Sequence, residues 1–346
     1  MVQRGQNIMQ PLSVVRGFVP TIVTAIATLM LASPPTMANP SITALFDPAA
    51  NGGAGFSAAD MATIENALSF YATNITSTVS VTVDFTTQTA GGASTVQGYY
   101  NGLSYSDYYS ALASNASLTG NAVQVSAVGS LPNTTNNPVT GSSGVTMSTT
   151  LASLFGLASQ SNDPQANCGV LSGAACIEIG LDELGQPSLL GTVQHEFDEV
   201  LGTSSALSIG NQTPTDPTAA DLFRYASPDV RSFAANSDTS EPCGGPTAYF
   251  SVNGGITNIN SYNNCNNGGD YGDWASGAIP QVQDAFGDPS DFTSLSLASP
   301  EIALLEAVGY DFVSPTSTPE PATIGLLLVG AAGLWRTRRG RIIHAG

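Results

Sequence analysis

The sequence contains no lysine, and its cationic side chains are eight arginines against 26 acidic residues. Six of these arginines lie near the two ends of the chain, so residues 39–318 hold 25 acidic residues and two arginines, a net charge of −23. A surface of this charge repels nucleic-acid phosphates and anionic lipid headgroups, and it attracts cations. The composition therefore excludes nucleic acid and anionic membranes as partners of residues 39–318.

Histidine is nearly absent as well. His344 lies close to the C-terminus, which leaves His195 as the one histidine of residues 39–318, at the start of the segment HEFDEVLG. On a helix, His195 and Glu199 lie one turn apart on the same face, and Glu196 is rotated by roughly 100° from His195. This spacing predicts that His195 and Glu199 bind a divalent cation while Glu196 polarises a water molecule. The alternative is a solvated helix face that binds nothing.

An apolar run near the N-terminus predicts export. Arg4 and Arg16 precede the run, which covers residues 18–32, and small residues follow it up to Ala38. A charged region, an apolar region and a small-residue cleavage site are the three parts of a secretory signal peptide. We therefore expect residues 1–38 to be removed on export.

A second apolar run, residues 322–335, lies near the C-terminus between a Pro-Glu-Pro segment and four arginines. Over residues 319–346 this order resembles the PEP-CTERM sorting signal of Gram-negative bacteria. The resemblance implies that an exosortase-type sorting machinery reads the tail during transient membrane contact, and that the protein is secreted or reaches the cell surface or extracellular matrix. A transmembrane helix that anchors the protein is the alternative, although roughly 20 apolar residues are needed to cross a bilayer. Residues 314–318 then form a linker after a domain of residues 39–313.

The four cysteines of an exported chain favour two disulfides. Closeness in sequence favours the pairs Cys168–Cys176 and Cys243–Cys265. Four cysteines allow three connectivities, and the sequence does not select one. A four-cysteine zinc site is the alternative, but no two of these cysteines have the close C-x-x-C spacing of such sites.

Hydrophobic periodicity predicts an alternation of helices and strands. Helices are expected at residues 58–74, 107–113 and 189–201, and strands at 79–85, 123–127 and 176–181. The last strand is expected at the edge of a sheet, and residues 129–145 are expected to form a surface loop. In the last helix, five apolar residues form a core-facing stripe away from His195 and Glu199, and Gly202 ends the helix.

The motif H-E-x-x-E-x-x-G at residues 195–202 resembles the metzincin motif H-E-x-x-H-x-x-G-x-x-H. The third metzincin ligand would fall on Ser205, which is a poor ligand. The order of the predicted elements is similar to that of a zincin catalytic domain, in which an edge strand binds peptide substrates. The resemblance implies an α+β fold: a zincin/metzincin-like catalytic domain with a mixed twisted sheet and an active-site helix.

The chain also resembles a group of exported bacterial proteins that have a PEP-CTERM tail, carry H-E-x-x-E and are regarded as zinc metalloproteases. The similar segments are the motif helix and residues 221–225, 270–274 and 302–310. This resemblance implies a peptidase that acts on protein or peptide substrates, with zinc favoured over manganese and calcium.

The motif does not supply a third metal ligand. Asp221 lies 22 residues beyond Glu199, a distance at which some zincins place an acidic ligand. Thr218 and Asp221 also fit a capping box, in which Asp221 binds the terminus of its own helix. Similar enzymes use a tyrosine near this point to stabilise the oxyanion of a tetrahedral intermediate, a role that Tyr225 would take. A packed core tyrosine is the alternative.

Asparagine and aspartate gather in the glycine-rich segment 263–273. Their oxygens suit a structural Ca²⁺ ion. The spacing is not that of an EF-hand, however, and turns of this composition also bind their own backbone.

Two functions follow from these observations. In the first, Glu196 takes a proton from the attacking water, and the protein is an exported peptidase. In the second, it is a non-catalytic surface or matrix protein that has a degenerate zincin fold and binds cations or polysaccharide. The missing third ligand favours the second function, and the glutamate at position 196 favours the first.

Overall fold

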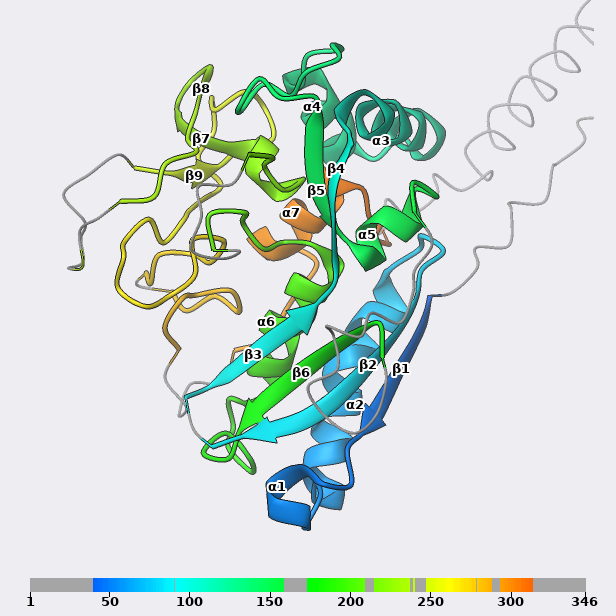
Figure 1. Ribbon diagram of the computed structural model, residues 1–346, viewed down its shortest axis with the longest axis vertical. Helices are drawn as coiled ribbons and strands as arrows, with labels where there is room; N and C mark the ends of the chain where they lie inside the picture. The colour runs from blue at the N-terminus through cyan, green and yellow to red at the C-terminus, as the bar shows by residue number, and fades with distance from the viewer. Residues whose placement is uncertain are drawn as a thin grey trace, which may run out of the picture. The chain divides into compact units, whose positions relative to one another are not determined.

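Several sheets and helices are mixed along the described part of the chain, consistent with the expected α+β class (Figure 1). The computed structural model describes residues 40–89, 91–158, 173–208, 215–236, 239, 247–277, 279–287 and 293–313. These residues belong to one compact unit. The predicted signal peptide, linker and sorting tail lie outside the described residues, as do Cys168 and Cys243.

A mixed sheet carries the strands nearest to the motif helix. Its strands, in order, are β1 (Ser41–Phe46), β2 (Ser80–Gln88), β6 (Ala175–Gly180) and β3 (Ala93–Gln97). β1, β2 and β6 are parallel to one another, whereas β3 runs antiparallel to β6. Val81, Val83 and Phe85 of β2 are buried, as their period-two pattern predicts.

The strand directly before the motif helix is not the edge strand, so this prediction is wrong. β6 lies between β2 and β3, and its residues Cys176, Ile177 and Ile179 are fully buried. A nearly continuous apolar run is typical of such an inner strand. The sheet has two edge strands, β1 and β3, and the one that contacts α6 is β3, whose five residues are all half-buried. Its Ala-Ser-Thr-Val-Gln sequence therefore has no alternation that would reveal it.

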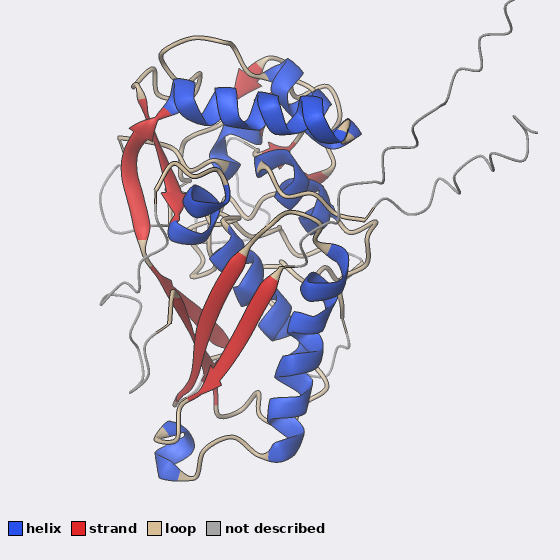
Figure 2. Ribbon diagram, turned by 90° about the vertical axis from the view of Figure 1, so that its right-hand side faces the viewer, coloured by secondary structure: helices blue, strands red, loops and turns tan. Residues whose placement is uncertain are grey.

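Two long helices cover one face of this sheet (Figures 1 and 2). α2 (Ala58–Asn74) has the predicted bounds, and the hydroxyl of Ser57 caps it by accepting the Asp60 amide at 3.1 Å. α6 (Leu189–Leu201) is the predicted motif helix. Gly202 ends α6 with a φ of 115°, a left-handed conformation that favours glycine. The predicted core-facing stripe is buried and consists of Leu189, Val193, Phe197, Val200 and Leu201.

The segment predicted as a strand at residues 123–127 is part of a helix, α4 (Ala122–Ser130). Asn121 caps this helix because its side-chain oxygen accepts two amides of the first turn, at 2.9 and 3.2 Å. Val125 is 54% exposed, whereas Gln124 and Ala127, three positions apart, are buried. The buried side thus follows a helical period, which the alternating valines obscure in the sequence.

The remaining helices and strands complete the described part of the chain. Three further helices come earlier in the chain: α1 (Ala50–Gly53), α3 (Tyr105–Thr119), which extends the helix predicted at 107–113, and α5 (Thr149–Leu154). β4 (Tyr99–Ser104) pairs with β5 (Gly144–Ser148), so the predicted loop ends where β5 begins. A 3₁₀ turn (Ala220–Phe223) precedes a second sheet with the order β10 (Asn260–Ser261), β9 (Tyr249–Phe250), β7 (Arg224–Ser227) and β8 (Val230–Arg231). The last helix, α7 (Pro300–Val308), contacts both α4 and α6.

Cys176 and Cys265 are buried, and each is part of a disulfide. Their predicted partners lie outside the described residues, so the pairing stays a prediction. The predicted apolar tail also lies outside them. Within the part of the chain that the structure describes, no helix combines the length and apolar character needed to span a membrane.

Candidate metal centre

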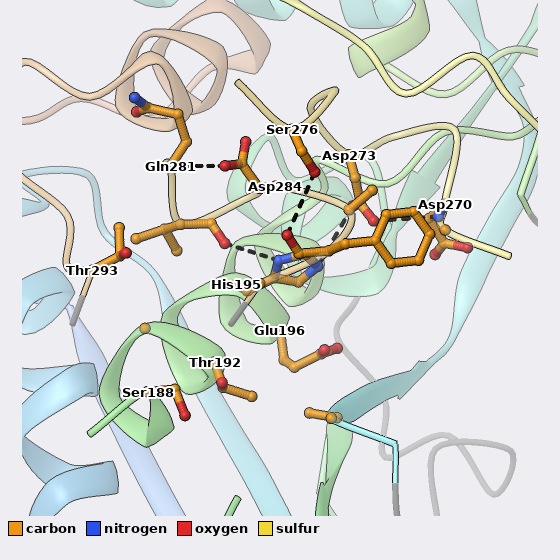
Figure 3. A pocket seen from close by; sticks show the side chains of 18 of the residues that line it. Ser188, Thr192, His195, Glu196, Asp270, Asp273, Ser276, Gln281, Asp284 and Thr293 are labelled. Atoms are coloured by element: carbon orange, nitrogen blue, oxygen red, sulfur yellow. Dashed lines mark hydrogen bonds and ion pairs between the residues drawn. The ribbon is translucent and has the colours of Figure 1, made fainter. Parts of the chain in front are cut away.

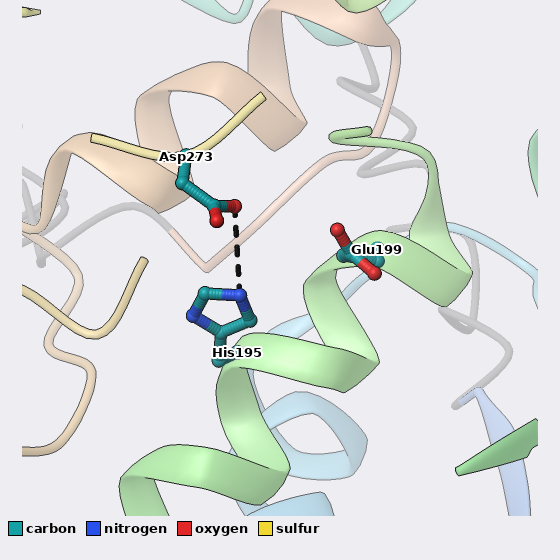
Figure 4. A group of neighbouring side chains, drawn as sticks. All are labelled: His195, Glu199 and Asp273. Atoms are coloured by element: carbon teal, nitrogen blue, oxygen red, sulfur yellow. Dashed lines mark ion pairs between the residues drawn. The ribbon is translucent and has the colours of Figure 1, made fainter. Parts of the chain in front are cut away.

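Ligand atoms of His195, Glu199 and Asp273 come together beside α6 (Figure 4). One ligand atom from each residue lies within 4.8 Å of the other two. His195 Nε2 and Asp273 Oδ1 are 3.5 Å apart. In a tetrahedral site with bonds of about 2.1 Å, two ligand atoms lie about 3.4 Å apart. Among the described residues, this is the one group of acidic, histidine or cysteine side chains with such a geometry.

α6 positions two of these residues and a loop positions the third. The buried stripe of α6 packs into the core, which leaves His195 and Glu199 on another side of the helix, one turn apart. Asp273 lies in the segment between β10 and α7. Its Oδ1 accepts the side-chain amide of Gln283 at 3.1 Å, and its Oδ2 accepts the Asp270 amide at 3.3 Å. These bonds fix the carboxylate against the imidazole.

The imidazole of His195 is oriented for ligation through Nε2. Its Nδ1 lies 3.0 Å from the carbonyl oxygen of Val282. Because a carbonyl oxygen can only accept, Nδ1 carries the proton, and the lone pair of the neutral ring lies on Nε2, towards Asp273. Histidine ligands of metal ions commonly donate their other ring N–H in this way.

The electrostatic potential at His195 is strongly negative because three carboxyl groups lie around it. Burial by itself would lower the pKa of His195, but the carboxylates of Asp273, Glu196 and Glu199 and the carbonyl of Val282 outweigh it and raise this pKa to about 10. The carboxylates of the site therefore stabilise a positive charge on His195. A bound divalent cation would take the place of that proton.

The three carboxyl groups around His195 all resist ionisation. Burial raises the pKa of Glu199 well above its usual range, and repulsion from Glu196 and Asp273 adds to the effect. Burial also raises the pKa of Asp273, to about 6, and that of Glu196, although the charge on His195 opposes both shifts. A cation among these groups would relieve their repulsion. The residues present thus fit a divalent metal ion.

Glu196 lies beside the ligand group without belonging to it. Thr95 of β3 donates its hydroxyl to the Glu196 carboxylate at 2.7 Å, and this hydroxyl also lies 2.9 Å from the Glu196 carbonyl oxygen. Gln97 of the same strand donates its side-chain amide to the Glu199 carbonyl at 2.6 Å. The edge strand is thereby tied to α6, and Glu196 is held at the wall of the pocket (Figure 3).

A cavity of about 600 Å³ opens at these residues. Its walls come from α6, from the start of β3 with the glycines before it, and from residues 268–277 and 280–287. Six carboxylates line it: Glu183, Glu196, Glu199, Asp270, Asp273 and Asp284. No arginine is among the described lining residues, since Arg224 and Arg231 are hydrogen-bonded elsewhere. The negative potential of these carboxylates favours cationic groups in the cavity.

Asp221 lies outside the ligand group. Its Oδ2 accepts the amide and the hydroxyl of Thr218 and the amide of Ala206, each at 2.9 Å. Its Oδ1 accepts the hydroxyl of Ser205 at 2.6 Å. The contacts with Thr218 are those of the capping alternative, and the contacts with Ser205 and Ala206 join Asp221 to the segment after α6. Ser205, at the third metzincin position, is bound to the same carboxylate, and neither residue lines the cavity.

Tyr225 is not a lining residue either. It is buried in β7, and the guanidinium carbon of Arg231 lies 4.7 Å from the centre of its ring. This contact is a cation–π interaction between a buried tyrosine and a half-buried arginine, so the packed-core alternative describes Tyr225.

The asparagine-rich loop binds its own residues. The side-chain amide of Asn263 donates to the side chain of Asn267 at 3.1 Å and to the carbonyl of Asp270 at 3.3 Å. Its side-chain oxygen accepts the Cys265 amide at 3.4 Å. A structural calcium ion in this loop stays a prediction.

Sequence reasoning did not assign Asp273 as a ligand of the His195 site. Two features of the sequence could have indicated it: Asp273 belongs to the oxygen-rich segment 263–273 and to segment 270–274, which carries part of the family resemblance. Thr95 and Val282 gave no signal in the sequence. Thr95 reaches Glu196 only because β3 pairs with β6, and Val282 acts through its main-chain carbonyl, which any residue has. Comparisons of the chain with protein-family models, with curated proteins and with solved structures found no match. The function is therefore argued from the site itself.

Proposed function

We propose that this protein is a metal-dependent peptidase with zinc as its preferred ion. The observation that carries the proposal is the convergence of His195, Glu199 and Asp273 with Glu196 directly beside them. Three protein ligands leave a fourth position open, which is the pattern of catalytic zinc sites. One nitrogen and two oxygen donors form an oxygen-rich set, so manganese and calcium are the next candidates.

Each residue of the site has a separate role in the proposed hydrolysis. A bound zinc ion would polarise the scissile carbonyl and lower the pKa of a water molecule at the open position. Glu196 accepts the proton of the attacking water and delivers it to the leaving amine. Thr95 keeps the Glu196 carboxylate in place for both transfers. The Val282 carbonyl keeps the His195 ring in the orientation that ligation requires.

The arrangement of strand and helix supports a zincin-like catalytic domain. β3 is an antiparallel edge strand, lies against α6 and lines the same cavity. Its outer edge has no strand partner among the described residues. An extended peptide paired with that edge would pass the point where the ligand atoms meet. Substrates of this class are unfolded segments of proteins or peptides.

In this proposal the protein acts outside the cell. The signal peptide directs export, and the PEP-CTERM-like tail is processed by an exosortase-type machinery, so that the enzyme is secreted or kept at the cell surface. The rival function, a cation-binding matrix protein, uses the same acidic site without hydrolysis. Glu196 separates the two, because metal binding does not require it.

The test compares wild type with Glu196→Gln and with Glu65→Gln, a control on the exposed side of α2. After zinc loading, wild type and Glu65→Gln should cleave an unfolded protein substrate at the same rate. Glu196→Gln should bind zinc equally well but cleave about 10² to 10⁴ times more slowly, the usual contribution of a general base. A zinc-loaded wild type that cleaves nothing would support the matrix-protein function instead.

A further inference from the structure

Glu301 is a buried acid that the proposed mechanism does not use. It lies in the first turn of α7 and is completely buried. Its Oε1 accepts two hydrogen bonds, one from the indole N–H of Trp274 at 3.1 Å and one from the backbone amide of Gln283 at 3.0 Å. Its Oε2 has no hydrogen-bond partner among the described residues.

These two donors flank the two groups that contact the imidazole of His195. Trp274 directly follows Asp273, whose carboxylate faces Nε2. Gln283 directly follows Val282, whose carbonyl accepts Nδ1–H. Trp274 and Gln283, the residues that follow the two groups in contact with the ring, are thus both hydrogen-bonded to Glu301 Oε1.

The two anchored segments are also joined to each other. The Trp274 amide donates to the Gln283 carbonyl at 2.7 Å, and the Ala285 amide donates to the Trp274 carbonyl at 3.0 Å. The Gln283 side chain reaches back to the Asp273 carboxylate. Between residues 270 and 287 the described chain forms only isolated bridges and no longer strand. No sheet ladder in the described part of the chain joins these segments to α6. Their main-chain bonds run to Ser261 and Asn263 at β10, and Glu301 adds an anchor on α7, which packs against α6.

We propose that Glu301 is a positioning residue of the metal centre, which holds Asp273 and Val282 at the distance from α6 that ligation requires. The proposal rests on the metal site of the proposed function and not on peptidase activity. Burial raises the pKa of Glu301, which favours its neutral form. A neutral acceptor of the same shape should therefore suffice.

Zinc affinity of the full-length protein tests the proposal, measured by competition with a chelating indicator. Glu301→Leu, which removes the acceptor, should weaken zinc binding about 10- to 100-fold, as loss of a group that orients a ligand usually does. Glu301→Gln keeps an oxygen at the acceptor position and should restore near wild-type affinity. Trp274→Phe removes one donor, keeps an aromatic ring and should give an intermediate loss.

Gln124→Leu is the matched control for general destabilisation. Gln124 is also fully buried, and its amide donates to the Tyr310 carbonyl and the Asp311 carboxylate at 2.9 and 3.0 Å, away from the cavity lining. This variant should lose stability but keep its zinc affinity. The absorption spectrum of the cobalt(II)-loaded protein gives a second readout, since only displacement of ligands changes it.

Each outcome is decisive. Wild-type zinc affinity and an unchanged cobalt spectrum in Glu301→Leu would overturn the proposal, as would an equal loss in Gln124→Leu. If Glu301→Leu does not fold, unaltered affinity in Trp274→Phe overturns it, and so does failure of Glu301→Gln to bind. Absence of zinc binding in wild type would refute the metal site itself, whereas zinc binding without peptide cleavage would refute only the peptidase.

Discussion

Separate replacement of Asp273 and Asp221 tests which aspartate completes the metal site. Both side chains are buried, but their contacts differ. Asp273 Oδ1 lies 3.5 Å from His195 Nε2, whereas the Asp221 carboxylate accepts hydrogen bonds from Thr218 and from two neighbouring residues. The first substitution should therefore affect metal binding, and the second should affect stability.

Asp273→Ala should weaken zinc binding by more than about 100-fold, because even groups that only orient a ligand change metal affinity by about 10- to 100-fold. Asp221→Ala should keep its zinc affinity. It should lower the free energy of unfolding of the metal-free protein by about 3 kcal/mol, from the lost cap and the lost hydrogen bonds to a buried carboxylate. In metal-free Asp273→Ala the stability should not fall as far, since the lost attraction to His195 is offset in part by relief of the repulsion with Glu199 and Asp270.

Zinc affinity would be measured by indicator competition, and stability by urea unfolding of chelator-treated protein. Asp221→Asn serves as a milder variant if Asp221→Ala does not fold. The assignment is refuted if a folded Asp221 variant loses zinc binding while Asp273→Ala binds zinc like wild type.

Three further predictions concern the base, the substrate and the response to pH. Thr95→Val should lower kcat about tenfold without loss of zinc, because the Glu196 carboxylate loses its donor, and Thr95→Ser should retain activity; equal rates for both variants would contradict this role. The acidic cavity should give peptides with lysine or arginine near the cleaved bond a lower KM than acidic peptides, an advantage that shrinks as salt is added; a preference for acidic peptides would contradict it. Burial raises the pKa of Glu301 above its ordinary 4.5, so its contribution to stability is complete below that pH and is lost as the pH rises through the folded-state value. Urea unfolding at increasing pH should therefore show a smaller loss of stability for Glu301→Gln than for wild type, and identical pH profiles would count against a raised pKa.

The parts of the fold that local sequence determines were predicted well. α2 and α6 have the expected bounds because a capping serine, an apolar stripe at helical spacing and a terminal glycine are all local signals. α4 was mistaken for a strand because Val123 and Val125 alternate, while the cap at Asn121 went unrecognised. Where two periodicities compete within a few residues, the capping residue is the better guide.

The parts of the site that depend on long-range pairing were not predictable. β3 becomes an edge strand through a backbone ladder to β6, whose paired residues lie 78 to 86 positions later in the chain. The side chains of β3 carry no pattern of their own. Asp273 reaches His195 from a loop, where no spacing rule applies. His195, Glu196 and Glu199 could be named from the sequence because one helical turn fixes their relation. The third ligand, Asp273, is brought to this helical turn only by the tertiary fold.

X-ray absorption at the zinc edge of the zinc-loaded protein tests the central claim most directly. The account predicts one zinc ion per chain, with one imidazole nitrogen and carboxylate oxygens at about 2.0 to 2.2 Å. The imidazole contribution should vanish in His195→Ala. A chain that binds no zinc after loading, or a zinc ion surrounded by sulfur at about 2.3 Å, would contradict the assignment of His195, Glu199 and Asp273 as the ligands.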